Sequence, residues 1–345
     1  MRIEGIDFRH PKTKMTNDDV VGLVRDHSEK QFEGDLDVAM RSVSFMLDNI
    51  GLKERYWMKD ERPLDLMLQA AENAIAKSGI DKADIELLVF CGIARGFLEP
   101  ADSYFIAQEL ELDHVDCFDV MDACMAWTRA TDIVEAFFKA GRYKTAIIVN
   151  AEDYFRQGGV SYPSNFQLKN FKSIEYSFGA YCGGDGAAAT VLSADGPDWE
   201  RNYISTKICP DLCTVPLPGF EGHCNKTDLI ALNGLGSFTS FSSRVFQNYQ
   251  HMIDVLVKMA PSFDGLKAIY AHTGGDVHAY ERWAQTAGAG GKVKYLFPNF
   301  GNLGTVSMPA SICNDITNGD LKRGERVGCW ISSSGLSFAS YALTY

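Results

Sequence analysis

The sequence predicts an α/β protein in which parallel β-sheets are covered by helices. Residues 85–91 and 145–150 are largely apolar segments of strand length without alternation, so both faces of these strands are expected to be buried. Amphipathic helices are expected between such strands, and the same alternation returns in the second half of the chain. The 345 residues, 46% of them hydrophobic, are enough for a large duplicated core.

In the first half, each expected element has a local signal. Thr16 precedes Asp18 and Asp19, the pattern of a helix N-cap followed by an acidic first turn, and Gly79 is a typical helix stop. Pro100 suits the first turn of a helix. We expect strands at residues 3–8, 85–91, 118–120, 145–150 and 187–192, and helices from about 17, at 64–78, at 100–109 and from the residues after Cys124 to 139.

The second half repeats the order, which suggests an internal duplication with halves at residues 1–195 and 196–345. Residues 151–181 lack periodicity and are expected to form an irregular excursion that shapes a pocket or an interface. We expect strands at 202–208, 268–272, 293–297, 326–331 and 335–343, and helices at 241–259, 276–287 and 307–318.

Composition excludes several classes of function. A net charge of −12 argues against a nucleic-acid partner, because binding phosphates needs a basic surface. There is no apolar run of 18 residues and no apolar segment near Met1, so we expect a cytoplasmic protein without a membrane partner. The nine cysteines are expected to be reduced. Four residues of types that bind zinc lie close together in the sequence: Cys209, Cys213, His223 and Cys224. Their spacing is not that of a standard zinc finger, so we expect this segment to form a loop over the mouth of the site and to bind no metal.

Cys124 is the strongest single candidate for chemistry. It lies between a short strand from Phe118 and a helix whose apolar face includes Trp127 and Val134. At a helix start, free N–H groups and the positive end of the dipole favour the thiolate, which is the nucleophilic form. The alternative is a small buried hydrophobic residue, which is what most cysteines are.

Two further polar residues follow apolar strands. His272 ends the strand 268–272, and Asn302 lies in a Gly-Asn-Leu-Gly turn after the strand 293–297. Taken singly, the histidine fits a structural hydrogen bond and the asparagine fits a turn. The carboxyl ends of parallel strands are, however, where side chains converge on ligands. We therefore expect Cys124, His272 and Asn302 to share a site.

Several motifs stand out in chain order: 119–124 (DVMDAC), 183–188 (GGDGAA), His272, 300–309 (FGNLGTVSMP) and 333–338 (SSGLSF). Together they resemble β-ketoacyl-acyl carrier protein synthase III, a branch of the thiolase superfamily. Near the N-terminus, the resemblance continues in Thr16-Asn17 and 50–55 (IGLKER). It covers nearly the whole chain and is specific only as a set.

The resemblance implies a duplicated five-layered α-β-α-β-α thiolase-like fold, a homodimer and an acyltransferase. Cys124 would accept an acyl group from a thioester, and the backbone N–H groups of Cys124 and Gly335 would form the oxyanion hole. His272, as a neutral Nε2–H donor, and Asn302 would hydrogen-bond the carbonyl of a second, malonyl or acyl, thioester during condensation. The implied substrates are thioesters of coenzyme A or of carrier-protein phosphopantetheine, with no permanently bound cofactor.

The chain departs from the family pattern in ways that bear on its substrates. Thr273-Gly274-Gly275 replaces the usual residues after the histidine, and Ser333 and Ser334 replace glycines. The family tryptophan that stacks on the coenzyme A adenine matches Phe45, and the nearby arginine is Asn49. We therefore expect weaker or different holding of coenzyme A, and a role in specialised or fatty-acid-related metabolism.

Glu99 leaves the type of condensation open. The segment Phe97-Leu98-Glu99-Pro100 resembles enzymes that join two acyl-coenzyme A molecules without decarboxylation, in which a glutamate of one subunit acts as a base in the partner's site. The alternative is an ordinary glutamate at a helix entry. Two other functions stay open. One is ping-pong acyl transfer to a hydroxyl or amine. The other is a catalytically silent partner subunit of another condensing enzyme, although such subunits usually lack the cysteine or the histidine.

Overall fold

The computed structural model describes residues 1–206, 209–225 and 228–345, and its core is a pair of five-stranded mixed sheets. The first sheet has the order β1-β7-β6-β4-β5, with β1 (Arg2–Arg9), β4 (Leu87–Cys91), β5 (Asp116–Val120), β6 (Thr145–Glu152) and β7 (Gly186–Ser193). The second has the order β8-β14-β13-β11-β12, with β8 (Glu200–Ser205), β11 (Leu266–Ala271), β12 (Val293–Lys294), β13 (Arg326–Ser333) and β14 (Ser337–Thr344).

The two sheets have matching topology. In each, the three strands β4, β5 and β6, or β11, β12 and β13, run parallel. The two remaining strands lie on one side of these three, and each is antiparallel to the neighbour that precedes it in the sheet: β7 and then β1 in the first sheet, β14 and then β8 in the second. Strand order and strand direction are therefore the same in both halves of the chain.

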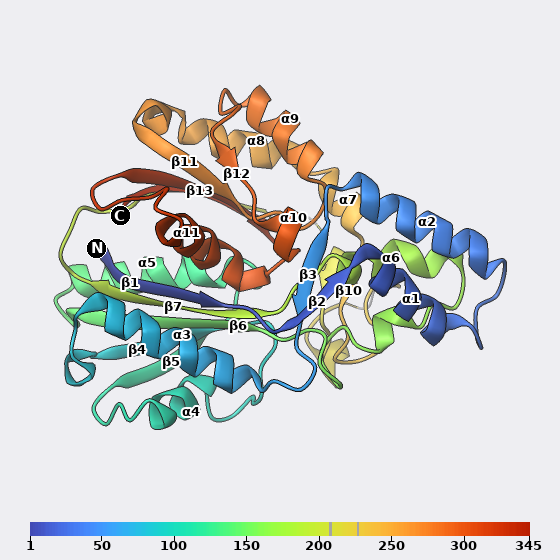
Figure 1. Ribbon diagram of the computed structural model, residues 1–345, viewed down its shortest axis with the longest axis horizontal. Coiled ribbons are helices and arrows are strands. Elements are labelled where there is room, and N and C mark those ends of the chain that lie inside the picture. Colours follow the sequence, from blue (N-terminus) through green and yellow to red (C-terminus); the bar gives the residue numbers. More distant parts are fainter. Residues whose placement is uncertain (207–208, 226–227) are drawn as a thin grey trace.

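Helices complete five layers (Figure 1). α3 (Pro63–Ser78) and α4 (Asp102–Glu109) cover the outer face of the first sheet, and α8 (Tyr249–Lys258) and α9 (Val277–Thr286) lie outside the second. Between the sheets lie α5 (Ala126–Lys139) and α11 (Ser307–Thr317). The apolar face of α5, including Trp127 and Val134, is buried in a cluster that draws on both sheets. The predicted α/β fold is thus confirmed, with the two sheets and their helices in five layers.

A side lobe extends from one end of the layers, opposite the chain termini (Figure 1). It contains α1 (Asn17–Ser28), α2 (Leu36–Asn49), α6 (Phe171–Tyr181), α7 (Ser242–Phe246), the strand pair β2 (Thr13–Thr16) and β3 (Glu54–Trp57), and the pair β9 (Cys213–Thr214) and β10 (Thr239–Ser240). The predicted cap of α1 is present, because Thr16 and Asp19 bond each other's backbone N–H groups.

Three sequence predictions were wrong in detail. The helix expected at 241–259 is interrupted at Gln247 and Asn248, because the Asn248 amide bonds back to the carbonyls of Arg244 and Val245. The excursion 151–181 contains the regular helix α6, capped by Asn170. The strand expected at 293–297 ends at Lys294 and is followed by the short helix α10 (Phe297–Phe300).

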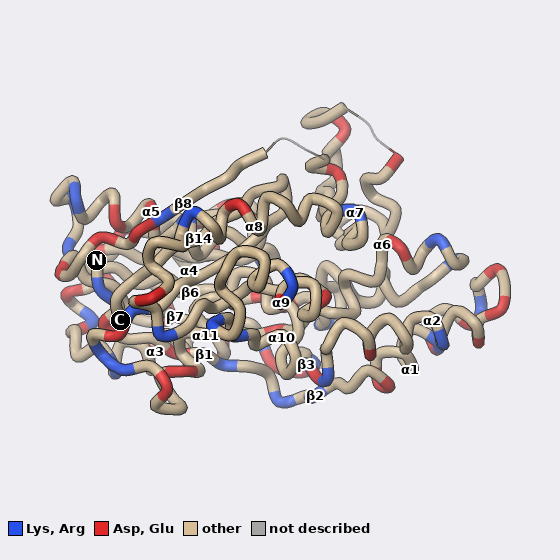
Figure 2. The backbone as a smooth tube through the Cα atoms, turned by 90° about the horizontal axis from the view of Figure 1, so that it is seen from above, with Lys and Arg blue, Asp and Glu red and all other residues tan. Residues whose placement is uncertain are grey.

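Three other observations bear on the sequence analysis. The last two residues of the strand expected at 202–208 lie outside the described residues. Within the described ranges, no helix is long and apolar enough to cross a membrane. Lys and Arg are interspersed with Asp and Glu along the described chain (Figure 2).

Candidate active site

Cys124 lies in a tight turn that joins β5 to α5. The N–H of Met125 bonds the carbonyl of Asp122 at 3.0 Å, and the N–H of Ala126 bonds the carbonyl of Ala123 at 3.0 Å. Ala123 has a φ of 45°, a left-handed conformation that costs a non-glycine residue about 1 kcal/mol or more. The turn directs the partly exposed Cys124 into a cavity of about 1000 Å³, counting its open mouth.

The same cavity is lined by His272 and Asn302. The three side chains come from loops after β5, β11 and α10, and so from both halves of the chain. The structure therefore brings together the three residues that the sequence singled out. Their joint position around one cavity is the central feature of the site.

His272 is held as a neutral ring. Its backbone N–H bonds the carbonyl of Trp330 at 2.9 Å, and its Nδ1 lies 2.8 Å from Oγ of Ser307, the first residue of α11. Burial lowers the pKa of His272 to about 4, so the ring is uncharged at pH 7. With Nδ1 engaged by Ser307, Nε2 is the ring nitrogen left for a ligand.

Asn302 is oriented by the backbone around it. Its N–H bonds the carbonyl of Cys182 at 2.7 Å, and its own carbonyl accepts the N–H of Gly184 at 3.0 Å. Oδ1 accepts the N–H of Gly304 at 2.9 Å, so the amide nitrogen is the end left to donate. Gly274 lies beside this nitrogen, where a Cβ would be 3.6 Å from Nδ2. The small residues after His272 thus leave the amide of Asn302 uncovered.

Ser333 ties the Cys124 turn to the end of β13. Its Oγ accepts the N–H of Met125 at 3.2 Å and donates to the carbonyl of Asp122 at 3.0 Å. These bonds link residues far apart in the sequence, so no local pattern could indicate them. The serine therefore fixes the nucleophile turn against the second half of the chain.

The expected preference of Cys124 for the thiolate is not borne out. Burial is the main cause that raises the pKa of the Cys124 thiol, and the neighbouring Cys213 and Glu152 raise it further. The stabilisation of the thiolate by the helix N-terminus is smaller than the cost of removing the thiolate from water. The raised pKa favours the thiol, whose proton must leave as the sulfur attacks a substrate.

Glu152, at the end of β6, is a buried carboxyl group that the sequence analysis missed. It accepts the N–H groups of Ile93 and Thr305, and it also bonds the side chain of Tyr154, which lines the cavity. Burial raises the pKa of Glu152 to about 7. A Cβ at Gly304 would lie 2.8 Å from Oε1, so glycine is needed for this approach. A charged residue at the end of an otherwise apolar strand was the available signal.

The remaining predicted residues lie elsewhere. Gly335 does not line the cavity, although Ser334 and Leu336 on either side of it do. Glu99 is exposed and outside the cavity of its own chain. Phe45 is 68% exposed on α2 and is also outside the cavity. Among the described residues, no group of three or more His, Cys, Asp or Glu side chains could hold a metal ion.

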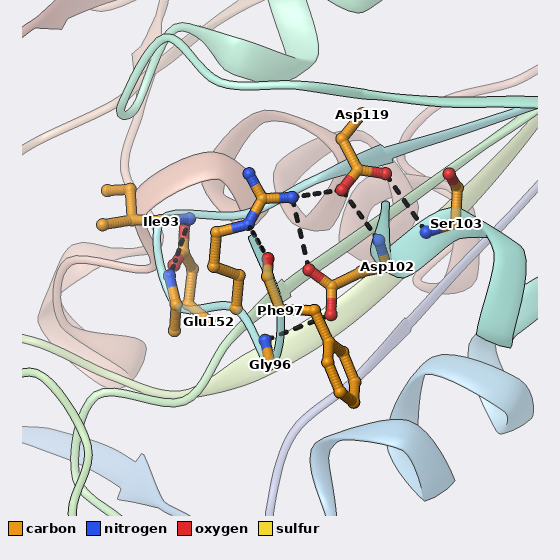
Figure 3. A network of polar contacts seen from close by, with 9 residues as sticks. Ile93, Gly96, Phe97, Asp102, Ser103, Asp119 and Glu152 are labelled. Atoms are coloured by element: carbon orange, nitrogen blue, oxygen red, sulfur yellow. Dashed lines mark hydrogen bonds and ion pairs between the residues drawn. The ribbon is translucent and has the colours of Figure 1, made fainter. Parts of the chain in front are cut away.

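A polar network fixes the loop that carries Glu99 (Figure 3). The carboxylate of Asp119 on β5 accepts the N–H groups of Asp102 and Ser103 at 2.9 and 3.1 Å, which satisfies the first donors of α4. Arg95 pairs with both Asp119 and Asp102. Phe97, whose carbonyl accepts from Arg95, is 47% exposed, and the adjacent Leu98 is 77% exposed.

Comparison with curated proteins gives distant relatives of one kind. The sequence is 23% identical to beta-ketoacyl-[acyl-carrier-protein] synthase III of Clostridium perfringens over 287 residues, 80% of this chain and 83% of that protein. It is 25% identical to the enzyme of the same name from Aliarcobacter butzleri over 332 residues, 91% of this chain and 92% of that one. No family model matches the sequence.

Solved structures share the fold over almost the whole chain. OleA of Xanthomonas campestris, in a cysteine-to-serine variant with bound lauric acid and lauroyl-CoA, has a TM-score of 0.80 at 19% identity and covers 99% of this chain and 98% of its own. The 3-oxoacyl-[acyl-carrier-protein] synthase III of Aquifex aeolicus has a TM-score of 0.78 at 19% identity, with coverage of 100% and 99%. By sequence the chain is a distant relative of β-ketoacyl-[acyl-carrier-protein] synthase III, and by structure it has the thiolase-like fold.

Proposed function

We propose that the chain is an acyltransferase that loads an acyl group from a thioester onto Cys124 and condenses it with a second thioester to form a β-ketoacyl product. The observation that carries this proposal is the common cavity of Cys124, His272 and Asn302. The sulfur can attack the carbonyl of one thioester, and the two neutral hydrogen-bond donors can then stabilise negative charge on the carbonyl oxygen of the second. The relatives named for this reaction support it.

In the first half-reaction, the sulfur of Cys124 attacks the thioester carbonyl, and the thiol of coenzyme A or carrier-protein phosphopantetheine leaves with a proton. The negative oxygen of the intermediate accepts a hydrogen bond from the backbone N–H of Cys124, which lines the cavity, whereas Gly335, the second donor that the resemblance implies, does not line it. Because burial raises the pKa of the Cys124 thiol, proton removal must accompany attack.

In the second half-reaction, a malonyl or acyl thioester becomes an enolate by losing carbon dioxide or an α-proton. Nε2–H of His272 and Nδ2–H of Asn302 donate to its thioester oxygen and so stabilise the negative charge. The enolate carbon attacks the acyl carbonyl on Cys124, the new carbon–carbon bond forms and the sulfur is released. The retained Asn302 favours this outcome over acyl transfer to a hydroxyl or amine.

The position of Glu99 supports the variant without decarboxylation. Glu99 is exposed beside Phe97 and Leu98, whose side chains are largely uncovered, and the adjacent β5 is an edge strand. We propose that two copies pair across this edge as a homodimer, so that Glu99 of one copy serves as the base in the other. Each site would then contain residues from both halves of one copy, 1–195 and 196–345, together with Glu99 of the other copy.

Intact-mass measurement after incubation with acyl-coenzyme A or acyl-carrier protein tests the loading step. The wild-type chain should gain one acyl group, Cys124→Ala should gain none, and Asn302→Ala should load but not condense. An acyl adduct on Cys124→Ala would contradict the proposal. Adding malonyl-carrier protein, a second acyl thioester or an alcohol to the loaded enzyme then identifies the acceptor from the product.

Glu99→Gln separates the two condensations. If Glu99 is the base, this variant should load Cys124 normally and lose condensation of two acyl thioesters by at least about a hundredfold, with malonyl-dependent condensation retained. Glu109→Gln, at the exposed far end of α4, is the matched control. Equal rates for Glu99→Gln and Glu109→Gln would remove Glu99 from the mechanism.

A further inference from the structure

Four aromatic side chains form one wall of the cavity: Phe246, Tyr249, Tyr280 and Trp283, here called the aromatic wall. Trp283 is at its centre. Its ring centroid lies 5.5 Å from that of Phe246, 4.9 Å from that of Tyr280 and 5.9 Å from that of Tyr249, on which it stacks at 9°. The four residues come from α7, α8 and α9.

The aromatic wall extends from the interior to the surface. Tyr280 is buried, and its hydroxyl lies 3.3 Å from Oγ of Ser332, which also lines the cavity. Tyr249 is 46% exposed at the other end. Because Cys124 lines the same cavity, a group attached to its sulfur has a path along these rings.

The departure from the family pattern after His272 makes room for this wall. A Cβ at Gly275 would lie 3.1 Å from two ring atoms of Phe246, closer than a side chain normally packs. The glycine therefore allows Phe246 to sit directly against the turn that follows the histidine. The glycine at position 275 and the position of Phe246 in the aromatic wall are therefore structurally linked.

We infer that the aromatic wall binds a planar aromatic acyl group carried on Cys124, an inference that rests on the proposed function and names its substrate class. Fixed rings gain from edge-to-face and offset contacts with another ring beyond the area they cover, whereas a saturated group of equal size gains only the area. Three other residues that line the cavity, Met252, Leu336 and Phe338, are also apolar. The hydroxyls of Tyr280 and Ser332 offer hydrogen bonds to a polar substituent on the ring.

Phenylacetyl and cyclohexylacetyl thioesters of N-acetylcysteamine provide the test, because the two acyl groups match in size and neither ring is conjugated with the carbonyl. Acylation of Cys124 is followed by intact mass, and each rate is divided by the rate with free cysteine. We expect phenylacetyl to load about fivefold faster. Equal rates, or faster loading of cyclohexylacetyl, would overturn the inference.

Variants show whether the aromatic wall causes the preference. Trp283→Leu and Phe246→Leu should bring the ratio close to one while the cyclohexylacetyl rate is kept, and Phe171→Leu, an exposed site outside the cavity, should leave the ratio unchanged. A preference that persists in both wall variants contradicts the inference. If neither thioester acylates Cys124, the proposed function fails, and calorimetric binding of the two thioesters to Cys124→Ala still decides whether the wall prefers the aromatic ring.

Discussion

Replacing Glu152 by Gln should remove a pH-dependent loss of stability. Burial raises the pKa of Glu152 from about 4.5 to about 7 in the folded chain. Below pH 4.5 the carboxyl is protonated in both the folded and the unfolded state, so it has no linked effect. As pH rises to 7, the unfolded state releases its proton first, and stability falls. A shift of this size corresponds to about 3 kcal/mol of unfolding free energy.

The assay is urea unfolding at several values from pH 4.5 to 8, with fluorescence and circular dichroism required to agree. The free energy of unfolding of Glu152→Gln minus that of the wild type should rise by about 3 kcal/mol across this range. Subtraction cancels groups that titrate equally in both proteins. Glu109→Gln, an exposed site, should follow the wild type. Parallel curves for the wild type and Glu152→Gln would refute the argument that burial sets this pKa.

Three further predictions concern the residues that hold the site. Ser307→Ala removes the partner of His272 Nδ1 and should slow condensation about fivefold, with acyl loading unchanged in the intact-mass assay; slowed loading would argue for a general structural role. Ser333→Ala should lower the free energy of unfolding by about 1–2 kcal/mol, because two buried bonds to the Cys124 turn are lost, whereas Ser337→Ala, whose buried Oγ has no partner in the described chain, should not. Because burial lowers the pKa of His272 to about 4, condensation by preloaded Glu152→Gln enzyme should keep its rate from pH 8 to 5, and a fall centred near pH 6.5 would contradict a buried neutral ring.

Elements with a strong local pattern could be predicted from the sequence. Strand β4 is fully apolar and β6 largely so because both of their faces are buried, and the cap residues Thr16 of α1 and Gly79 of α3 lie directly next to those helices. Helix α6 was missed because its signal, the cap residue Asn170, lies inside a polar aromatic stretch without a clear apolar face. The break at Asn248 depends on a side-chain bond that periodicity does not indicate.

The same distinction applies to the site. Cys124, His272 and Asn302 could be found because each follows a strand or its turn, where side chains converge. Ser307 and Ser333 could not, since their partners are distant in the sequence and a serine has no fixed signature. The pKa of the Cys124 thiol was misjudged for a related reason: the helix terminus is visible in the sequence, whereas the burial that outweighs it arises only from the assembled fold.

The matching topology of the two sheets has a consequence for how the chemistry can change. Each half offers loops that follow equivalent strands, and in the proposed mechanism the halves have different roles: the first supplies the sulfur that would carry the acyl group, and the second supplies His272 and Asn302, which would bind the acceptor. Neither half alone holds a complete set of reacting groups. Substitutions in the loops of the second half can therefore alter the acceptor while the acyl-carrying turn in the first half stays as it is.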